Sequence, residues 1–128
     1  MHIYDMDTNF QGGWALVAEQ LPYAVGAARS IVLDKHLNTG EAEDRIAIVF
    51  VGEGGAQNGR MAECLNAAAK ENLPILFLVI DNGRAINTFT KDVAQNQEVF
   101  NQGKHYGIPG VLADGQNVQV RFFVFYIP

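Results

Sequence analysis

The sequence contains a single cysteine, no cluster of lysine or arginine and no long hydrophobic run. Cys64 has no second cysteine to pair with, so an internal disulfide is excluded, and with it a scaffold stapled by such bridges. The neighbours of Cys64 favour a place in the core over a role as a nucleophile. No stretch approaches the roughly 20 apolar residues that a membrane-spanning helix needs, so we expect no membrane partner.

Positive charge is also scarce, with 9 lysine and arginine residues against 14 aspartate and glutamate residues and a net charge of −5. Proteins that bind nucleic acid need clustered basic side chains to meet the phosphates, so nucleic acid is not an expected partner. Residues 1–7 have neither the basic region nor the apolar run of a signal peptide, and they do not form an amphipathic transit peptide. We therefore expect no targeting segment in this sequence.

The length and composition are those of one globular domain, with 128 residues of which 48% are hydrophobic and 18% charged. Apolar residues at helical spacing predict helices over about 20–35 and 58–72. Continuous apolar runs at 46–51 and 75–80 are typical of strands buried on both faces of a parallel sheet, and 110–113 is a candidate third strand. The order of strand, glycine-rich turn, helix and strand predicts an α/β fold, in which helices flank a parallel sheet.

Two polar segments follow the two predicted strands directly. Gly52-Glu53-Gly54-Gly55 comes after the first strand, and Asp81-Asn82-Gly83 after the second. Ligands of open parallel sheets bind beyond the carboxyl ends of the strands, where glycines let backbone N–H groups approach a diphosphate. The side-chain oxygens of Glu53 and Asn82 suit Mg²⁺ or Ca²⁺. The pattern therefore predicts a site for a divalent cation and a diphosphate.

The same residues are also compatible with ordinary turns between strands and helices, in which glycine serves tight geometry and asparagine caps a helix. The pattern alone does not choose between the two interpretations. The pattern is neither the G-x-G-x-x-G fingerprint of dinucleotide binding nor a Walker loop. The hypothesis of a nicotinamide cofactor therefore depends only on analogy between fold classes.

The span from Gly52 to Asn82 resembles the thiamine diphosphate motif, in which Gly-Asp-Gly is closed about thirty residues later by a pair of asparagines. Glu53 takes the acidic position here, 29 residues before Asn82. Further segments look like the alpha subunit of thiamine diphosphate-dependent 2-oxo acid dehydrogenases of the pyruvate dehydrogenase type: Asn9-Phe10-Gln11-Gly12-Gly13, Glu63-Cys64-Leu65-Asn66, Leu73-Pro74-Ile75, Gly107-Ile108-Pro109-Gly110-Val111 and Asp114-Gly115-Gln116-Asn117-Val118. The likeness implies an incomplete thiamine diphosphate-binding domain over 1–120, followed by a divergent apolar tail, 121–128.

The resemblance implies a role for individual residues. Glu53 and Asn82 would hold Mg²⁺ through their side-chain oxygens, and Arg84 through its backbone carbonyl. The positions expected to contact the cofactor are Ala15, Leu16, Val17, Gly52, Glu53, Gly54, Gly55 and Asn82. Glutamate at position 53 replaces the usual aspartate, and Asp81 replaces the first asparagine of the pair.

The resemblance also implies an activity and partners. The family decarboxylates a 2-oxo acid, with thiamine diphosphate as electron sink, and passes the acyl group to the lipoyl arm of an acyltransferase component. A beta subunit is expected, in an α₂β₂ assembly, within a plastid stroma, a mitochondrial matrix or a bacterial cytoplasm. The family's upstream Tyr-Arg pair and downstream histidine-rich loop have no counterpart here, so no catalytic residue is expected in this chain.

Other interpretations remain open. The Gly52-Glu53-Gly54 segment and Asn82-Gly83, followed by Ala85-Ile86, also look like the branched-chain 2-oxo acid dehydrogenase alpha subunit. A non-catalytic remnant that retains the α/β unit, with or without the cofactor, belongs to a different functional class. A transketolase-like enzyme is disfavoured by the Glu-Cys-Leu-Asn and Gly-Ile-Pro-Gly-Val segments.

Overall fold

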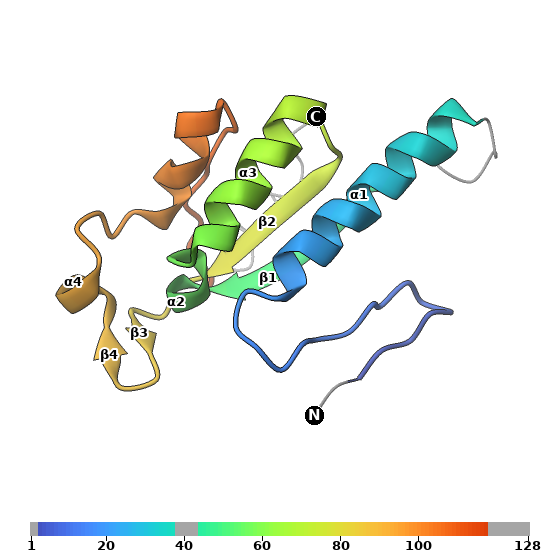
Figure 1. Cartoon of the computed structure of the whole chain (residues 1–128). Helices are drawn as coiled ribbons and strands as arrows, with labels where there is room; N and C mark the ends of the chain where they lie inside the picture. Colours follow the sequence, from blue (N-terminus) through green and yellow to red (C-terminus); the bar gives the residue numbers. More distant parts are fainter. Residues whose placement is uncertain (1–2, 38–43, 118–128) are drawn as a thin grey trace.

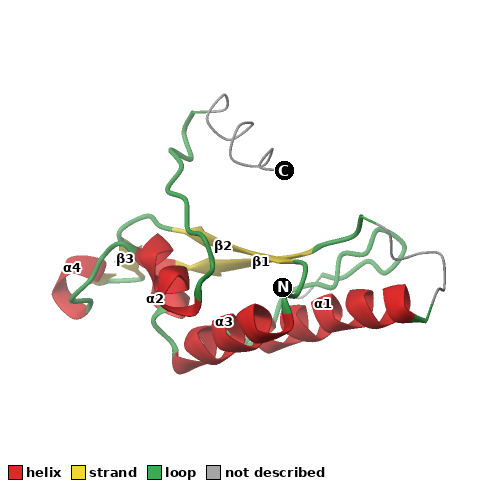
Figure 2. Cartoon of the chain, turned by 90° about the horizontal axis from the view of Figure 1, so that it is seen from above, coloured by secondary structure: helices red, strands yellow, loops and turns green. Residues whose placement is uncertain are grey.

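The structure is a computed structural model that describes residues 3–37 and 44–117. Two long helices, α1 (Gln20–His36) and α3 (Gly59–Glu71), lie on one face of a two-stranded sheet (Figures 1 and 2). The predicted apolar tail, 121–128, lies outside the described residues. None of the helices in the described ranges is long and apolar enough to cross a membrane.

The sheet is parallel, as the sequence predicts. Strand β1 (Ala47–Gly52) pairs with β2 (Ile75–Ile80) in a register that runs from Ala47 opposite Ile75 to Gly52 opposite Ile80. Helix α3 connects the two strands, so the α/β class and the βαβ order are confirmed.

Both predicted helices form with nearly the expected bounds. Helix α1 buries one stripe against the sheet. Asn58 precedes α3 and caps it, because its Oδ1 accepts the Arg60 N–H at 3.0 Å. Asn72 ends α3 in the left-handed conformation, with φ at 49°. Cys64 is buried in α3, where burial raises the pKa of its thiol, so its predicted place in the core is confirmed.

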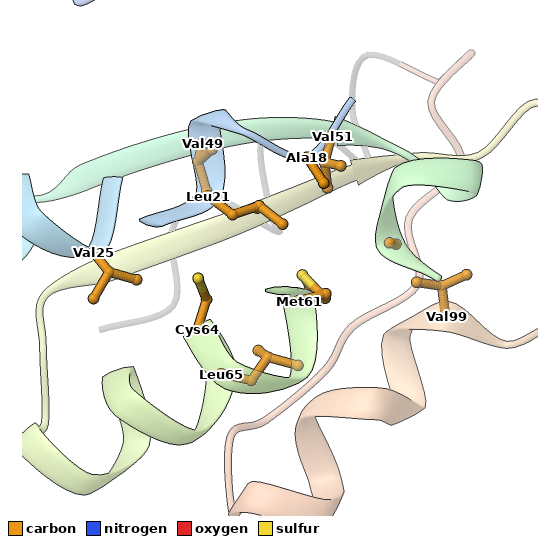
Figure 3. Packing of buried hydrophobic residues seen from close by; sticks show 10 residues of the cluster. Ala18, Leu21, Val25, Val49, Val51, Met61, Cys64, Leu65 and Val99 are labelled. Atoms are coloured by element: carbon orange, nitrogen blue, oxygen red, sulfur yellow. The ribbon is translucent and has the colours of Figure 1, made fainter. Parts of the chain in front are cut away.

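The core lies between the helices and the sheet (Figure 3). Side chains from α1, β1 and α3 converge there, and Leu21 is fully buried. The members of the buried cluster are Ala18, Leu21, Val25, Val49, Val51, Ala56, Met61, Cys64, Leu65 and Val99.

Outside the core, Arg29 of α1 and Glu71 of α3 form an ion pair, in which Arg29 Nε donates to Glu71 Oε2 at 2.7 Å. This hydrogen bond lowers the pKa of the Glu71 carboxyl.

The expectation that both strands are buried on both faces was wrong. Val49 and Val51 are buried under the helices, whereas Ile48 and Phe50 are 47% and 57% exposed. The reason is that α1 and α3 cover only one face of the sheet within the described ranges (Figure 2). Alternate residues of a strand point to opposite faces, so the second set faces outward.

The expectation of a third strand at 110–113 was also wrong, since these residues form no strand. They follow η1 (Val99–Tyr106), a 3₁₀ helix. A Cβ at Gly110 would fall 1.8 Å from the Phe100 carbonyl oxygen, so this segment is pressed against η1. Short elements complete the described chain, namely α2 (Glu53–Ala56), β3 (Arg84–Ala85), β4 (Thr88–Phe89) and α4 (Thr90–Val93).

Candidate cofactor-binding site

The two predicted ligand segments leave the sheet side by side. Gly52 and Ile80 are partners in the last position of the parallel ladder, and Glu53 and Asp81 come next along each strand. Glu53 is the first residue of α2, which Gly52 precedes in an extended conformation. The carboxyl ends of both strands therefore open at one edge, which is where parallel sheets bind their ligands.

Glu53 is the unusual group at this edge. Its side chain is only 3% exposed, and its Oε1 is buried without a hydrogen-bond partner among the described residues. Leaving a buried polar atom without a partner costs about 1–3 kcal/mol, and more when the group is charged. Native proteins seldom leave such an atom unless an ion, a water or a ligand completes it. A cation would satisfy this oxygen.

The segment after β2 forms two consecutive side-chain turns. Asp81 Oδ1 accepts the Gly83 N–H at 2.8 Å, and Asn82 Oδ1 accepts the Arg84 N–H at 3.1 Å. Strand β3 follows, not a helix, so the alternative of Asn82 as a helix cap is wrong. An amide oxygen carries two lone pairs, so Asn82 Oδ1 keeps one for a cation.

Arg84 opens the hairpin formed by β3 and β4, where it pairs with Phe89. Its guanidinium lies 4.2 Å from the centre of the Phe89 ring, a cation–π contact. Thr90 closes the hairpin, because its N–H donates to the Gly83 carbonyl at 3.1 Å. The Thr90 side chain is buried, and its Oγ1 has no partner among the described residues. No pattern in the sequence indicated this second unpartnered group.

The glycines of the turn make close packing possible. A Cβ on Gly54 would lie 2.6 Å from Ala85 Cβ, and one on Gly55 would lie 2.7 Å from Val51 Cγ2 and 3.1 Å from Val17 Cγ1. The turn is therefore pressed between the hairpin and the segment before α1. A Cβ on Gly52 would meet nothing within 4 Å. Of the predicted glycines, Gly52 is the one with open space beside it.

The segment 15–17 reaches this turn through Val17. Ala15, Leu16 and Val17 are all exposed, so their surfaces are available to a ligand. The segment is held in place by two residues that the sequence pattern did not indicate. Ala18 is fully buried with φ at 68°, and Gln20 Nε2 donates to the Phe50 carbonyl at 2.9 Å. Residue spacing in the sequence predicts neither the buried Ala18 nor the Gln20–Phe50 hydrogen bond.

The predicted donors suit a hard cation. They are the buried Glu53 carboxylate, the Asn82 amide oxygen and the Arg84 backbone carbonyl, and Mg²⁺ and Ca²⁺ prefer such oxygen ligands. Within the described residues, no group of three or more His, Cys, Asp or Glu side chains forms a separate metal site. Glu63 and Asn66 are exposed on α3, which favours a pair that faces solvent over a supporting role at this edge.

Fold and site together define an α/β unit with a parallel strand pair and an oxygen-rich edge beside a glycine turn. A model of the family described as "Dehydrogenase E1 component" matches residues 1–120. The chain therefore belongs to the dehydrogenase E1 component family, as the resemblance indicated.

Individual relatives share part of their length with this chain. The chloroplastic pyruvate dehydrogenase E1 component subunit alpha-3 of Arabidopsis thaliana is 36% identical over 118 residues, which cover 92% of this chain and 27% of the relative. The pyruvate dehydrogenase E1 component subunit alpha of Porphyra purpurea is also 36% identical over 118 residues, 92% of this chain and 34% of its own. The mitochondrial 2-oxoisovalerate dehydrogenase subunit alpha 2 of Arabidopsis thaliana is 39% identical over 108 residues, 84% of this chain and 21% of its own. The chain thus spans about a fifth to a third of these relatives.

Proposed function

We propose that this chain is the cofactor-holding portion of a pyruvate dehydrogenase E1 alpha subunit, and that the edge formed by Glu53 and Asn82 binds the diphosphate of thiamine diphosphate through Mg²⁺. The observation that carries the proposal is the buried, unpartnered Oε1 of Glu53 at the end of β1. The family match over residues 1–120 supports it.

In this proposal the cation has three protein ligands, namely the Glu53 carboxylate, the Asn82 amide oxygen and the Arg84 carbonyl. The Glu53 carboxylate is buried, and a buried charge attracts a cation more strongly than a charge in water does. The turns that fix Asn82 and Gly83 hold the second ligand in place before the cation arrives. The Arg84 guanidinium is engaged with Phe89, so its side chain need not enter the site.

The remaining predicted residues contact the diphosphate and the organic part of the cofactor. Gly52 has open space beside it, which is what close approach of a diphosphate requires. Ala15, Leu16 and Val17 offer exposed backbone and side chains for the aminopyrimidine ring. Bound thiamine diphosphate supplies an electron sink for decarboxylation of a 2-oxo acid. This chain's share is to hold and orient that cofactor.

The rest of the reaction needs partners. A beta subunit, in an α₂β₂ assembly, and a lipoyl-bearing acyltransferase component are proposed because the relatives that match this chain are named as E1 component alpha subunits. In this proposal the partners also supply the groups that move protons at the reacting carbon.

A branched-chain 2-oxo acid is the second candidate substrate. The 39% identity to a 2-oxoisovalerate dehydrogenase alpha subunit favours it over the 108 residues that align. Both candidates use the same cofactor edge, so they are separated by the substrate of the assembled enzyme and not by cofactor binding. A non-catalytic remnant, with or without the cofactor, is the third candidate, and a folded chain without cofactor affinity would favour it.

The proposal predicts that thiamine diphosphate binds this chain only when Mg²⁺ is present. Trp14 is the single tryptophan, it stacks on Tyr23 with ring centres 4.5 Å apart, and it adjoins Ala15, so a bound ring should quench its fluorescence. A saturable, weak quench is expected that EDTA abolishes. Thiamine without the diphosphate is the control and should give no Mg²⁺-dependent change. A folded chain whose Trp14 fluorescence does not change with the cofactor would contradict binding by this chain alone, and the same titration with a co-expressed beta subunit would then distinguish half of a site from a remnant.

A further inference from the structure

Thr90 carries a buried hydroxyl that the proposed cation does not use. The side chain is 8% exposed, and its Oγ1 has no hydrogen-bond partner among the described residues. The hydroxyl does not cap α4, because the N-terminus of that helix has no side-chain hydrogen bond. A buried hydroxyl without a partner is unfavourable, and native proteins seldom retain one unless a ligand or an ordered water completes it.

The pairing of the hairpin determines the face on which Thr90 lies. Arg84 pairs with Phe89, and the hydrogen bond from the Thr90 N–H to the Gly83 carbonyl extends this pairing by one position. Successive side chains of a strand alternate between its two faces. Arg84 and Phe89 share one face, where the guanidinium contacts the ring. Position 90 therefore lies on the other face, together with Ala85.

That other face of the hairpin is turned toward the glycine turn after β1. A Cβ on Gly54 would lie 2.6 Å from Ala85 Cβ, and the hairpin lies beside α2 (Figure 1). Glu53, whose buried Oε1 also lacks a partner among the described residues, directly precedes Gly54. The two buried oxygens thus belong to the two sides of one contact, Glu53 to the turn and Thr90 to the hairpin.

The two groups have complementary chemistry toward an anion that a cation holds. A carboxylate attracts the cation and only accepts hydrogen bonds, whereas a hydroxyl donates one, most strongly to a charged oxygen. We propose that the Thr90 hydroxyl donates a hydrogen bond to the diphosphate bound at this edge. The inference rests on the proposed function and adds a residue to it, because Thr90 positions the diphosphate and Glu53 holds the cation.

The Thr90→Val variant tests this role, because valine has nearly the shape of threonine and lacks the hydroxyl. Thiamine diphosphate is titrated calorimetrically in the presence of Mg²⁺ into the parent and the variant, each with a co-expressed beta subunit if the chain alone does not bind. A hydrogen bond to a charged group is lost, so affinity should fall by about tenfold or more. Thr90→Ser retains the hydroxyl and should retain most of the affinity. Thr88→Val, at an exposed position of the same hairpin, is the matched control and should bind as the parent does.

Two further measurements distinguish this role from a structural one. Inorganic pyrophosphate with Mg²⁺, measured by competition with the cofactor, should lose the same factor in affinity for Thr90→Val, because the hydroxyl contacts the diphosphate. In the absence of ligands, the urea midpoint of Thr90→Val should equal or exceed that of the parent, because the variant no longer buries an unpartnered hydroxyl.

Unchanged affinity in Thr90→Val, beside a parent that binds the cofactor, would overturn this inference and leave the proposed function intact. A loss of affinity that pyrophosphate does not share, or one that accompanies a lower urea midpoint, would also overturn it. A folded parent chain that binds no cofactor, either alone or with the beta subunit, would overturn the proposed function and this inference with it.

Discussion

Replacing Glu53 with glutamine should lower the Mg²⁺-dependent affinity for thiamine diphosphate by about 100-fold or more. Even residues that only support a metal ligand cost about 10–100-fold when mutated, and Glu53 is proposed as the ligand itself. Glutamine keeps the volume of the side chain but removes its charge. Isothermal titration of the cofactor, with Mg²⁺ in excess, measures the change.

The same substitution should act in the opposite direction on the chain without ligands. The buried Oε1 of Glu53 has no partner, so removing its charge should raise the free energy of unfolding by about 1 kcal/mol in urea denaturation. Glu63→Gln changes an exposed carboxylate on α3 and should alter neither quantity. Unchanged cofactor affinity in Glu53→Gln would remove Glu53 from the site, whereas lost stability without ligand would make its role structural.

Placing a methyl group at Gly54 should disturb both the fold and the site. The new Cβ would lie 2.6 Å from Ala85 Cβ, too close for any contact, so the hairpin that carries Arg84 must move away from the turn. Overpacking of this kind costs about 1–3 kcal/mol, and we expect Gly54→Ala to lose that much free energy of unfolding. Cofactor affinity should fall with it, because the Arg84 carbonyl is displaced.

A second substitution separates this clash from a general effect of alanine. Ala85→Gly removes the opposing methyl group, so the double variant Gly54→Ala/Ala85→Gly should recover most of both losses. Gly26→Ala is the control on α1, where a Cβ would meet nothing within 4 Å, and it should gain up to about 1 kcal/mol from helix propensity. A double variant as unstable as the single one would show that the two positions do not oppose each other.

Local features of this fold could be predicted from the sequence. The bounds of α3 were within a residue of the prediction because Asn58, its cap, is visible in the sequence itself. Strand β2 was predicted with the bounds that it has, since its apolar run begins after Pro74 and ends at Asp81. The placement of 52–55 and 81–83 at one edge of the sheet could be predicted from the βαβ order.

Features that depend on distant contacts could not be predicted. The Gln20–Phe50 hydrogen bond joins residues thirty positions apart, and the contact of Gly54 with Ala85 leaves no trace in residue spacing. The apolar run of β1 predicted burial on both faces, but apolar composition cannot say how many layers cover a strand. The burial of Glu53 likewise could not be predicted, because glutamate is seldom fully buried without a partner.

The central claim is that a cation bound with thiamine diphosphate lies between Glu53 and Asn82. Its most direct test replaces Mg²⁺ with paramagnetic Mn²⁺ and records amide signals by NMR in the presence of the cofactor. We expect the signals of 52–54 and 82–84 to broaden beyond detection, while those of 33–36, at the far end of α1, persist. Broadening centred elsewhere, with the signals of 52–54 and 82–84 sharp, would contradict the proposed site.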